Sequence, residues 1–464
     1  MQNFSLKKII VGLLILLFIL LVGMHVHQRT HFNKNVSINN VPVGGLTTQQ
    51  AYDKVSTTKR KSKIYVKHDL VYEGSATNSS FKPSDKVRIS KALRRQYTFF
   101  PSKKRENLIV EPANLDKSSL NDIDLAISKK VQQLNAGRTA PRDAYAVYQN
   151  GKVSIVPAVN GTQFSDTGLY NTVDKEFVNG TIHLTPRFIT PLSAHSKIVR
   201  NEKIKLSKLQ NRSVTYQVQK KNYRFTTDDV ISKATYQHGK YHFETKNIRE
   251  KIKKINAKQA TLGKSFKFKT ASGKVINTSN AGTYGWKISS KQAGQTLANA
   301  IISNKNNINA ESDIYGKGYS HLGTGYSVTS NHGIGRTYVA VSLADQHAWF
   351  YKNGKCVLST DIVSGSDNAA NRTPKGVWYI MYQQSPSVLR GTNDDGSKYS
   401  SPVQYWSPFT LSGCGFHDAS WRHDWSKTAY KQTNGGSHGC INMHPENAGD
   451  GFHALSKGEP VIIY

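Results

Sequence analysis

A cysteine and a histidine stand close together in the segment 437–443, which reads Ser-His-Gly-Cys-Ile-Asn-Met. A cysteine attacks as its thiolate, and a free thiol has a pKa of about 8.5, so it needs a nearby imidazole or another cation to become reactive. Two histidines can serve Cys440. His438 lies within the same segment, and His417 lies in the upstream segment 415–422, Gly-Phe-His-Asp-Ala-Ser-Trp-Arg. The sequence therefore predicts a cysteine nucleophile with a histidine base.

The order of these two segments, together with Thr-Pro-Lys-Gly at 373–376, resembles the L,D-transpeptidase catalytic domain (YkuD type) of bacterial cell-wall enzymes. The signature of that family is a His, a spacer, and then Ser/Thr-His-Gly-Cys followed by an apolar residue and Asn or Arg. The resemblance covers roughly residues 335–464. The 19 residues between His417 and Ser437 make a spacer slightly longer than is usual in the family, so His423 remains an alternative base.

The resemblance implies a reaction and roles for several residues. Cys440 would attack the carbonyl of the third residue of a stem tetrapeptide, release the terminal D-Ala and pass the acyl group to an amine acceptor, with His417 as proton donor and acceptor. The backbone N–H groups of Gly439 and Cys440 would stabilise the oxyanion, and Asp418 would orient His417 through its backbone carbonyl or its side chain. The residues expected to line the substrate cleft are Ser437, His438, Asn442, Tyr399 and Trp421.

Each of these roles has a simpler alternative. Asp418 can equally be a solvated loop carboxylate, because Asp often occupies loops. His438 can be a structural hydrogen-bonding residue, since only one histidine needs to carry the proton. The aromatic residues of the catalytic part can belong to the core of a β-rich domain, as most aromatic side chains do.

Other functional classes fit the sequence less well. A sortase also has His before Cys, but it needs an Arg shortly after the Cys, and none occurs at 441–464. Papain-like cysteine hydrolases place Cys before His. No His-Glu-x-x-His or Cys-x-x-Cys spacing supports a metal site among the clustered histidines, so we expect neither a metal nor a cofactor. A wall-binding adaptor that has lost its chemistry stays open as a non-enzymatic alternative.

An internal repeat with an offset of 121 residues precedes the catalytic part. Five residues at helical spacing, Ile127, Val131, Leu134, Asn135 and Ala136, map onto Ile248, Ile252, Ile255, Asn256 and Ala257. Tyr145 and Val147 map onto Phe266 and Phe268, and Gly161-Thr162 maps onto Gly282-Thr283. We therefore expect two copies of one α+β module.

These copies resemble the paired peptidoglycan-binding modules often found ahead of this catalytic domain, and Gly-Thr-Tyr-Gly-Trp at 282–286 is the most recognisable match. The alternative is that both copies only hold the enzyme away from the membrane. Under that alternative, Tyr284 and Trp286 are core residues rather than residues that stack on sugars.

The N-terminus carries a membrane signal. Lys7 and Lys8 precede the uncharged run 9–26, and its eighteen residues are just long enough to cross a bilayer. A cleaved signal peptide is the alternative, but no small-x-small cleavage site follows the run. We therefore expect a single-pass anchor in the cell membrane, with the C-terminal catalytic part extracellular, in the cell wall.

The charge is uneven along the chain. The formal net charge is +33, whereas residues 337–464 hold 10 Lys+Arg and 10 Asp+Glu, so all of the excess lies before them. A basic front half indicates an anionic partner surface. Nucleic acid is the generic partner of such a charge, but for an exported chain we expect anionic wall polymers or lipid headgroups and no nucleic acid. The substrate partner implied by the resemblance is the peptidoglycan stem peptide.

At 464 residues the chain is long enough for about two to four domains. The expected architecture is an N-terminal transmembrane helix, two α+β repeat modules and a C-terminal, mostly β catalytic domain built as a sandwich or open barrel. The expected boundaries are 1–30 for the cytoplasmic stub and anchor, 31–195 for a basic region with the first module, 196–314 for the second module, 315–335 for a linker and 336–464 for the catalytic domain. The three cysteines are too few for a disulfide framework. A single bond between Cys356 and Cys414 is one alternative, but we expect both to be buried thiols.

Overall fold

The computed structural model describes residues 2–319 and 321–464, so Met1 and Ser320, which falls in the expected linker, lie outside it. The chain divides into two compact units. The first comprises the N-terminal part up to Ala144 together with Pro157–Ser196. The second comprises Tyr145–Val156 together with Lys197–Tyr464.

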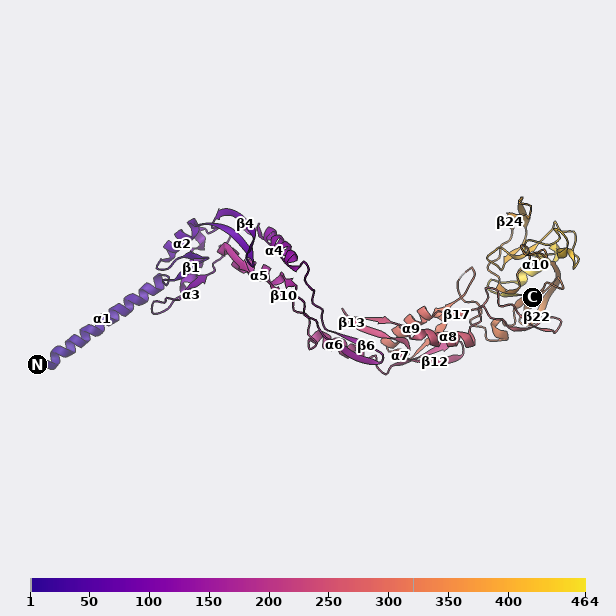
Figure 1. The fold of residues 1–464 in the computed structure, drawn as a ribbon, viewed down its shortest axis with the longest axis horizontal. Coiled ribbons are helices and arrows are strands. Elements are labelled where there is room, and N and C mark those ends of the chain that lie inside the picture. The colour runs from indigo at the N-terminus through magenta and orange to yellow at the C-terminus, as the bar shows by residue number, and fades with distance from the viewer. Residues whose placement is uncertain (1, 320) are drawn as a thin grey trace. The chain divides into compact units, whose positions relative to one another are not determined.

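The first unit begins with the long helix α1, Gln2–Thr30 (Figure 1). Its residues Leu6–Thr30 contain an 18-residue stretch that is apolar enough to cross a membrane and has no buried residue, and no other helix of the described chain meets that test. The apolar N-terminal helix that the sequence predicted is therefore present. Behind it follow two helices, α2 (Thr48–Thr57) and α3 (Lys86–Arg95), and a small sheet of strand order β2-β1-β5. These strands are β1 (Val36–Ile38), β2 (Val41–Pro42) and β5 (Glu106–Leu108).

Two three-stranded sheets with the same topology follow along the chain. In each, an antiparallel hairpin pairs through its first strand with a later parallel strand, giving the orders β4-β3-β9 and β12-β11-β18. The strands are β3 (Lys59–Val66), β4 (Asp69–Asn78), β9 (Thr181–Leu184), β11 (Ser213–Val218), β12 (Lys221–Thr226) and β18 (Asn307–Asn309). This shared topology is what an internal repeat requires.

The helices repeat in the same way. In the first copy α4 (Leu120–Asn135) leads to β8 (Phe164–Ser165), α5 (Thr167–Glu176) and β10 (Arg187–Phe188). In the second copy α8 (Ile248–Gln259) leads to β17 (Lys287–Ile288), α9 (Ser290–Ile302) and β19 (Ile314–Tyr315). In both copies the two short strands pair antiparallel.

One asparagine in each copy ties the first helix to the short strand. Asn135 donates from Nδ2 to the carbonyl of Phe164 (2.9 Å) and accepts its N–H at Oδ1 (2.8 Å). Asn256 makes the same two bonds, of 2.9 and 2.8 Å, with Ile288. The two asparagines that the sequence repeat aligns therefore have the same structural role, which is to join a helix to a short strand.

A hairpin projects between helix and short strand in each copy, and the structure places the two hairpins differently from a simple tandem repeat. The first, β6–β7 (Tyr145–Gln149, Lys152–Val156), belongs to the second unit. There β6 pairs with β13 (Lys233–Gln237) in the order β14-β13-β6-β7, where β14 is Lys240–Glu244. The second hairpin is β15–β16 (Lys267–Lys269, Val275–Asn277), and it packs through Phe268 on the catalytic part. A division of the chain at 195 separates β6–β7 from its sheet.

The motif at 282–286 serves packing. Trp286 is fully buried in the core of the second module and Tyr284 is 5% exposed. The N–H of Tyr284 bonds the carbonyl of Val377 (3.1 Å) in the catalytic part, and its hydroxyl bonds the carbonyl of Gly333 (2.7 Å). Both aromatics are thus core residues and neither offers a face to a sugar.

The segment 315–335 is fastened to the second module rather than free. Thr324 accepts the N–H of Gly285 (2.7 Å) through its hydroxyl, and Gln219 donates to the carbonyl of Tyr326 (2.7 Å). A short 3-10 helix, η4, spans Asn331–Gly333. The segment therefore connects the second module and the catalytic part by a packed path.

The catalytic part is built on an eight-stranded sheet of order β23-β29-β20-β21-β22-β28-β27-β26. Its strands are β20 (Tyr338–Ser342), β21 (His347–Lys352), β22 (Lys355–Val363), β23 (Gly376–Tyr379), β26 (Trp406–Pro408), β27 (Gly415–Asp418), β28 (Ile441–Met443) and β29 (Pro460–Ile463). The curled sheet confirms the mostly β open-barrel prediction. Helix α10 (Pro445–Ala454) packs on β21, β22 and β27, and Tyr284 and Phe268 share a core with β20, β23 and β29.

Two sequence signals in this part can be compared with the structure directly. Asn353 and Gly354 form the turn between β21 and β22 with φ of 50° and 84°, the left-handed values of a two-residue hairpin turn. All three cysteines are free. Cys414 is buried as expected, whereas Cys356 is exposed on β22, so that expectation was wrong for Cys356.

Candidate active site

Two neighbouring strands bring the histidine and cysteine segments together. Strands β27 and β28 pair in parallel, with Phe416 opposite Ile441 and His417 opposite Asn442. Because parallel neighbours need a long crossover connection, the residues between the two motifs are the loop that returns the chain to the same end of the sheet. Cys440 directly precedes β28, so in this parallel register it lies beside the start of β27 at Gly415.

A pocket of about 180 Å³ opens at this point. Seven of the nine site residues predicted from the sequence line it, namely Tyr399, His417, Trp421, Ser437, His438, Cys440 and Asn442. Asp418 and Gly439 do not, although both adjoin residues that do. His423, the alternative base, is not among the lining residues.

The hairpin β24–β25 (Ser387–Thr392, Lys398–Val403) forms one wall of the pocket. It contributes Leu389, Tyr399 and Ser401, and the turn between its strands contributes Asn393. The ring of Tyr399 stacks on that of His438 at 5.4 Å between centroids with an 11° angle between planes. His438 is thereby held on the hairpin side of the pocket.

His417 is buried and has one fixed ring nitrogen. Its Nδ1 lies 2.8 Å from the backbone carbonyl of Asp418, which requires a proton on Nδ1 for a hydrogen bond. Burial lowers the pKa of His417, and the Asp418 carbonyl opposes that shift only in part. The imidazole is therefore neutral at neutral pH, the state in which it can accept a proton. Trp421 stacks near the ring, 5.8 Å away.

The carboxylate of Asp418 points elsewhere. Its Oδ1 accepts the backbone N–H of Tyr405 at 2.8 Å. Of the two routes that the sequence left open, only the backbone carbonyl makes the contact with His417.

Asn442 links the histidine to an arginine. With the amide orientation that satisfies its partners, its oxygen lies 3.0 Å from both Nε and Nη2 of Arg422, and its nitrogen lies 3.2 Å from Nε2 of His417. Arg422 also donates from Nη1 to the carbonyl of Gly435 at 2.6 Å. The amide N–H on Nε2 and the Asp418 carbonyl on Nδ1 select the same tautomer, with the lone pair on Nε2.

Cys440 rests as a neutral thiol. Its side chain is partly exposed in the pocket, and its Sγ lies 3.5 Å from the carbonyl of Gly413. Burial of the sulfur raises the pKa of Cys440 to about 12, and the N–H of Gly415 opposes the shift. Within the described residues no hydrogen bond joins Cys440 to His417. The resting pair is thus thiol and imidazole rather than thiolate and imidazolium.

Hydrogen bonds shape the turn that carries the cysteine. Ser437 donates from Oγ to the carbonyl of Cys440 (2.7 Å) and accepts the N–H of Gly439 (3.1 Å). Gly439 has a φ of +111°, which favours glycine. The buried hydroxyl of Thr373 donates to the Gly439 carbonyl (3.0 Å) and accepts the N–H of Gly365 (2.9 Å). Thr373, the first residue of the segment 373–376, therefore holds the turn that carries Cys440 in place through these two hydrogen bonds.

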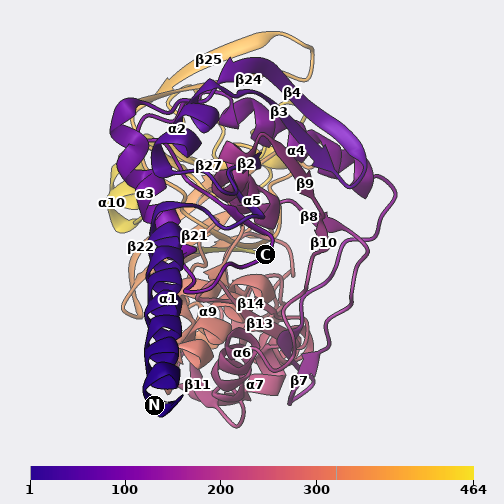
Figure 2. The same cartoon turned by 90° about the vertical axis from the view of Figure 1, so that its left-hand side faces the viewer.

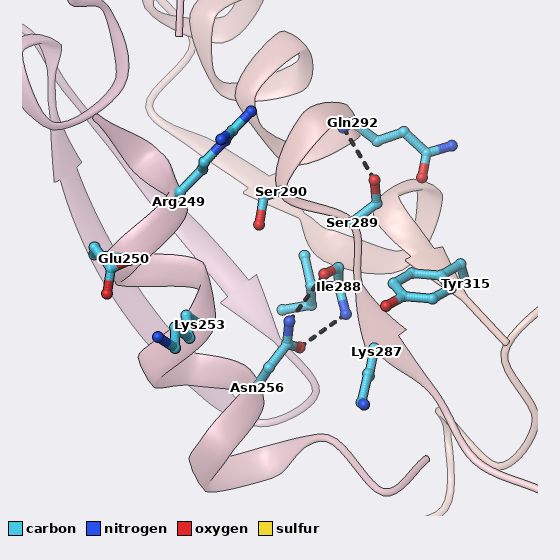
Figure 3. Close-up of a pocket in the computed structure, with 10 residues that line it drawn as sticks. All are labelled: Arg249, Glu250, Lys253, Asn256, Lys287, Ile288, Ser289, Ser290, Gln292 and Tyr315. Atoms are coloured by element: carbon cyan, nitrogen blue, oxygen red, sulfur yellow. Dashed lines mark hydrogen bonds between the residues drawn. The ribbon is translucent and has the colours of Figure 1, made fainter. Parts of the chain in front are cut away.

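A second hollow lies in the second module, at the N-terminus of α9 (Figure 3). Asn256 and Ile288, whose two hydrogen bonds join α8 to β17, are among its lining residues, and Ser289 accepts the N–H of Gln292 at 3.3 Å as the helix cap. Arg249, Lys253 and Lys287 lie around it. None of the predicted catalytic or substrate residues lines this hollow.

Comparisons with known proteins identify the domain in which this pocket lies. The model of the L,D-transpeptidase catalytic domain, YkuD, matches residues 336–463. The structure of the Ldtfm–avibactam carbamoyl enzyme is 31% identical over 56% of this chain and 96% of that chain, with a TM-score of 0.43. A cysteine-to-serine mutant of the Enterococcus faecium L,D-transpeptidase is 30% identical over 56% of this chain and 98% of that chain, with a TM-score of 0.43.

The catalytic domain of the E. faecium L,D-transpeptidase acylated by ertapenem is 43% identical over 28% of this chain and 98% of that chain, with a TM-score of 0.26. No curated protein matches the chain. The family model and these identities over nearly the full length of the relatives define the class, and the chain belongs to the L,D-transpeptidase family. Its domain at 336–463 is a transpeptidase catalytic domain.

Sequence reasoning missed five residues of the pocket. They are Leu389, Asn393, Ser401, Arg422 and Gly436. Arg422 carried a signal, since it ends the segment 415–422 that contains His417 and is one of only three arginines at 337–464.

Proposed function

We propose that this protein is a membrane-anchored L,D-transpeptidase that cross-links peptidoglycan through a thioester on Cys440. The observation that carries the proposal is the pocket in which Cys440, His417 and Asn442 meet. A catalytic domain of a 43% identical relative is described as acylated by ertapenem, and acylation of a thiol by a strained amide is the chemistry that the proposal needs.

The first half-reaction starts from two neutral groups. As Sγ of Cys440 bonds the carbonyl carbon of stem residue three, the thiol proton moves to Nε2 of His417, which Asn442 releases. The tetrahedral oxyanion then collapses, the bond to the terminal D-Ala breaks, and its amine nitrogen takes the proton from His417. The products are a thioester and free D-Ala, and His417 is neutral again.

The second half-reaction reverses the proton path. The amine of a neighbouring stem, or of its side bridge, attacks the thioester and gives its proton to Nε2 of His417. The sulfur leaves as the carbonyl re-forms and takes that proton back. A new peptide bond results, and every charge that forms during the cycle is neutralised within it.

The remaining residues support these steps. The N–H of Cys440 is our oxyanion donor, because Ser437 already accepts the N–H of Gly439 at 3.1 Å. Gly439 can contribute its N–H only if Ser437 rotates away. The carbonyl of Asp418 orients His417 by accepting a hydrogen bond from its Nδ1, which is 2.8 Å away. Tyr399, His438 and Trp421 would contact the stem peptide from the walls of the pocket.

The other parts of the chain have supporting roles in this proposal. Helix α1 is a retained single-pass anchor with the catalytic part outside the cell membrane, and a cleaved signal sequence is the alternative. The modules near 31–195 and 196–314 hold the enzyme in the wall, with the hairpin Tyr145–Val156 counted in the second. The basic front half faces anionic wall polymers or lipid headgroups rather than nucleic acid.

Two experiments test the proposal. The full chain is incubated with ertapenem, and the adduct is located by peptide mass spectrometry. We expect one adduct, on Cys440, that is lost in Cys440→Ala. In the second experiment the protein is supplied with a tetrapeptide stem and an amine acceptor, and release of D-Ala is followed. An adaptor without activity would give neither result, and D-Ala release by Cys440→Ala would overturn the nucleophile assignment.

A further inference from the structure

The loop at 97–101 lies against the C-terminal end of α1. The hydroxyl of Tyr97 is 2.8 Å from Nδ1 of His25, and the ring of Phe99 is 5.7 Å from the His25 ring between centroids. Helix α3 packs beside the same end of α1, as Figures 1 and 2 both show. The loop is thus seated beside the last turns of the long apolar helix.

The chain just beyond α1 holds the loop from its other side. The N–H of Asn33 donates to Gln96 (2.9 Å), and its Oδ1 accepts the N–H of Ser102 (2.9 Å). Asn35 donates to the carbonyl of Lys103 (2.6 Å). Contacts before and after the helix end therefore fix the height of the loop along the α1 axis.

This loop exposes apolar rings among cations. Phe99 is 45% exposed and Phe100 is 62% exposed, and the two rings touch edge to face with 5.0 Å between centroids. Five exposed basic residues flank them, and none of the five is in an ion pair in the described part of the chain. Together these residues form the helix-exit surface: Arg94, Arg95, Phe99, Phe100, Lys103, Lys104 and Arg105.

The apolar run of α1 sets the depth of this surface. Residues 9–26 rise about 27 Å at about 1.5 Å per residue, close to the roughly 30 Å hydrocarbon thickness of a bilayer. His25 lies at the end of that run, so a ring in contact with His25 lies at the boundary between acyl chains and headgroups.

We propose that the helix-exit surface docks on the leaflet through which the C-terminal end of α1 leaves the membrane. Phe99 and Phe100 insert at the boundary of the acyl chains, and the five cations face anionic lipid headgroups. Exposed aromatic rings beside Lys and Arg are the composition of interfacial membrane-binding segments. The proposal rests on the anchor role given to α1 above and extends it: the first unit lies on the bilayer instead of swinging freely at the end of its helix.

A lipid surface fits this patch better than another occupant does. The patch is continuous with a helix end that is itself in the membrane, so the headgroups are already within contact distance. A polyanionic wall polymer would satisfy the cations but not the two apolar rings, which would remain in water.

The test uses the full chain reconstituted in nanodiscs of phosphatidylcholine with and without phosphatidylglycerol. The variant Phe100→Trp adds one indole to six native tryptophans, and the wild-type emission is subtracted. Leu125→Trp is the matched control, because Leu125 is 71% exposed in the same unit but on α4, away from α1. We expect lipids brominated at the top of the acyl chain to quench Phe100→Trp about twofold or more relative to Leu125→Trp.

A second arm tests the charges. Combining Lys103→Gln, Lys104→Gln and Arg105→Gln with Phe100→Trp should lower the quenching in anionic discs and leave it unchanged in zwitterionic discs, because only anionic headgroups attract the cations. Equal quenching at positions 100 and 125 would overturn the proposal. So would a response of Phe100→Trp to a soluble polyanion and none to lipid.

The outcomes separate this inference from the proposed function. Loss of the anchor role would appear as failure of the wild-type chain to co-elute with discs. Loss of the catalytic role would appear as the absence of the ertapenem adduct on Cys440. Neither result depends on Phe99 or Phe100.

Discussion

Nδ1 of His417 lies 2.8 Å from the backbone carbonyl of Asp418, while the Asp418 carboxylate accepts the N–H of Tyr405. The imidazole is therefore oriented by a peptide group that no side-chain substitution removes. In serine proteases the same position is filled by a carboxylate, whose charge stabilises the imidazolium. In this protein that charge is turned away from the ring.

Asp418→Asn is accordingly expected to leave transpeptidation within about threefold of wild type, because Oδ1 can still accept from Tyr405 and the carbonyl is unchanged. Where a carboxylate itself orients the base, the same replacement costs about 10⁴-fold in kcat. The measurement is kcat for D-Ala release from a tetrapeptide stem. A loss near the larger value would show that the carboxylate turns toward His417 during the reaction.

The pH dependence of acylation should follow His417. Burial lowers the pKa of this imidazole, so the neutral base persists as the pH falls through about 6.5, the ordinary value for His. We expect kcat/KM for ertapenem acylation to stay level from neutral pH down past that value and to fall only below it. This fall is the acid limb of the profile. An acid limb centred at or above the ordinary pKa of His, about 6.5, would contradict the assignment of His417 as a neutral base.

Asn442→Asp should move that limb. A carboxylate at this position accepts from Nε2 and cannot donate to it, so it stabilises the protonated ring and raises the pKa of His417. The acid limb of kcat/KM should then shift to higher pH. Asn442→Ala is the control, since it removes the contact without adding charge. Loss of the hydrogen bond to the neutral ring should also raise the pKa of His417, but by less than a carboxylate does, so the limb should move less than in Asn442→Asp. An equal shift in both variants would show that the added charge has no effect.

The sequence predicted features that depend on neighbouring residues better than features that depend on residues far apart in the chain. The cysteine, its two histidines and the turn at Asn353-Gly354 are local patterns, and the structure contains all of them. The role of Arg422 required the pairing of β27 with β28, because only that register places Asn442 between Arg422 and His417. Long-range registers of this kind leave no local trace in one sequence.

The repeat shows the same limit. Equivalent asparagines and helices were visible at an offset of 121 residues. The destinations of the two projecting hairpins were not, because β6 pairs with β13 across a separation of more than eighty residues. A hairpin pattern predicts that two strands pair with each other, but it carries no information on which third strand they join.

Alkylation should show that Cys440 rests as a thiol. The pKa of Cys440 is raised to about 12 by burial, so its rate with iodoacetamide should keep rising with pH beyond about 10, since the thiolate is the reacting form. The exposed Cys356 is the internal comparison in the same digest. His417→Ala should leave this profile unchanged yet abolish acylation by ertapenem. A plateau for Cys440 near neutral pH would instead reveal a preformed ion pair.

Thr373 should matter for both stability and rate, although it does not line the pocket. Its hydroxyl is buried between the N–H of Gly365 and the carbonyl of Gly439, and Gly439 precedes the nucleophile. Thr373→Val leaves both backbone groups unpaired, and each unsatisfied buried group costs about 1–3 kcal/mol. We expect a lower free energy of unfolding in urea and slower acylation by ertapenem at temperatures where the variant is fully folded. Thr373→Ser keeps the hydroxyl and should restore the acylation rate. Acylation that is as slow in Thr373→Ser as in Thr373→Val would show that the two hydrogen bonds of the hydroxyl do not explain the effect.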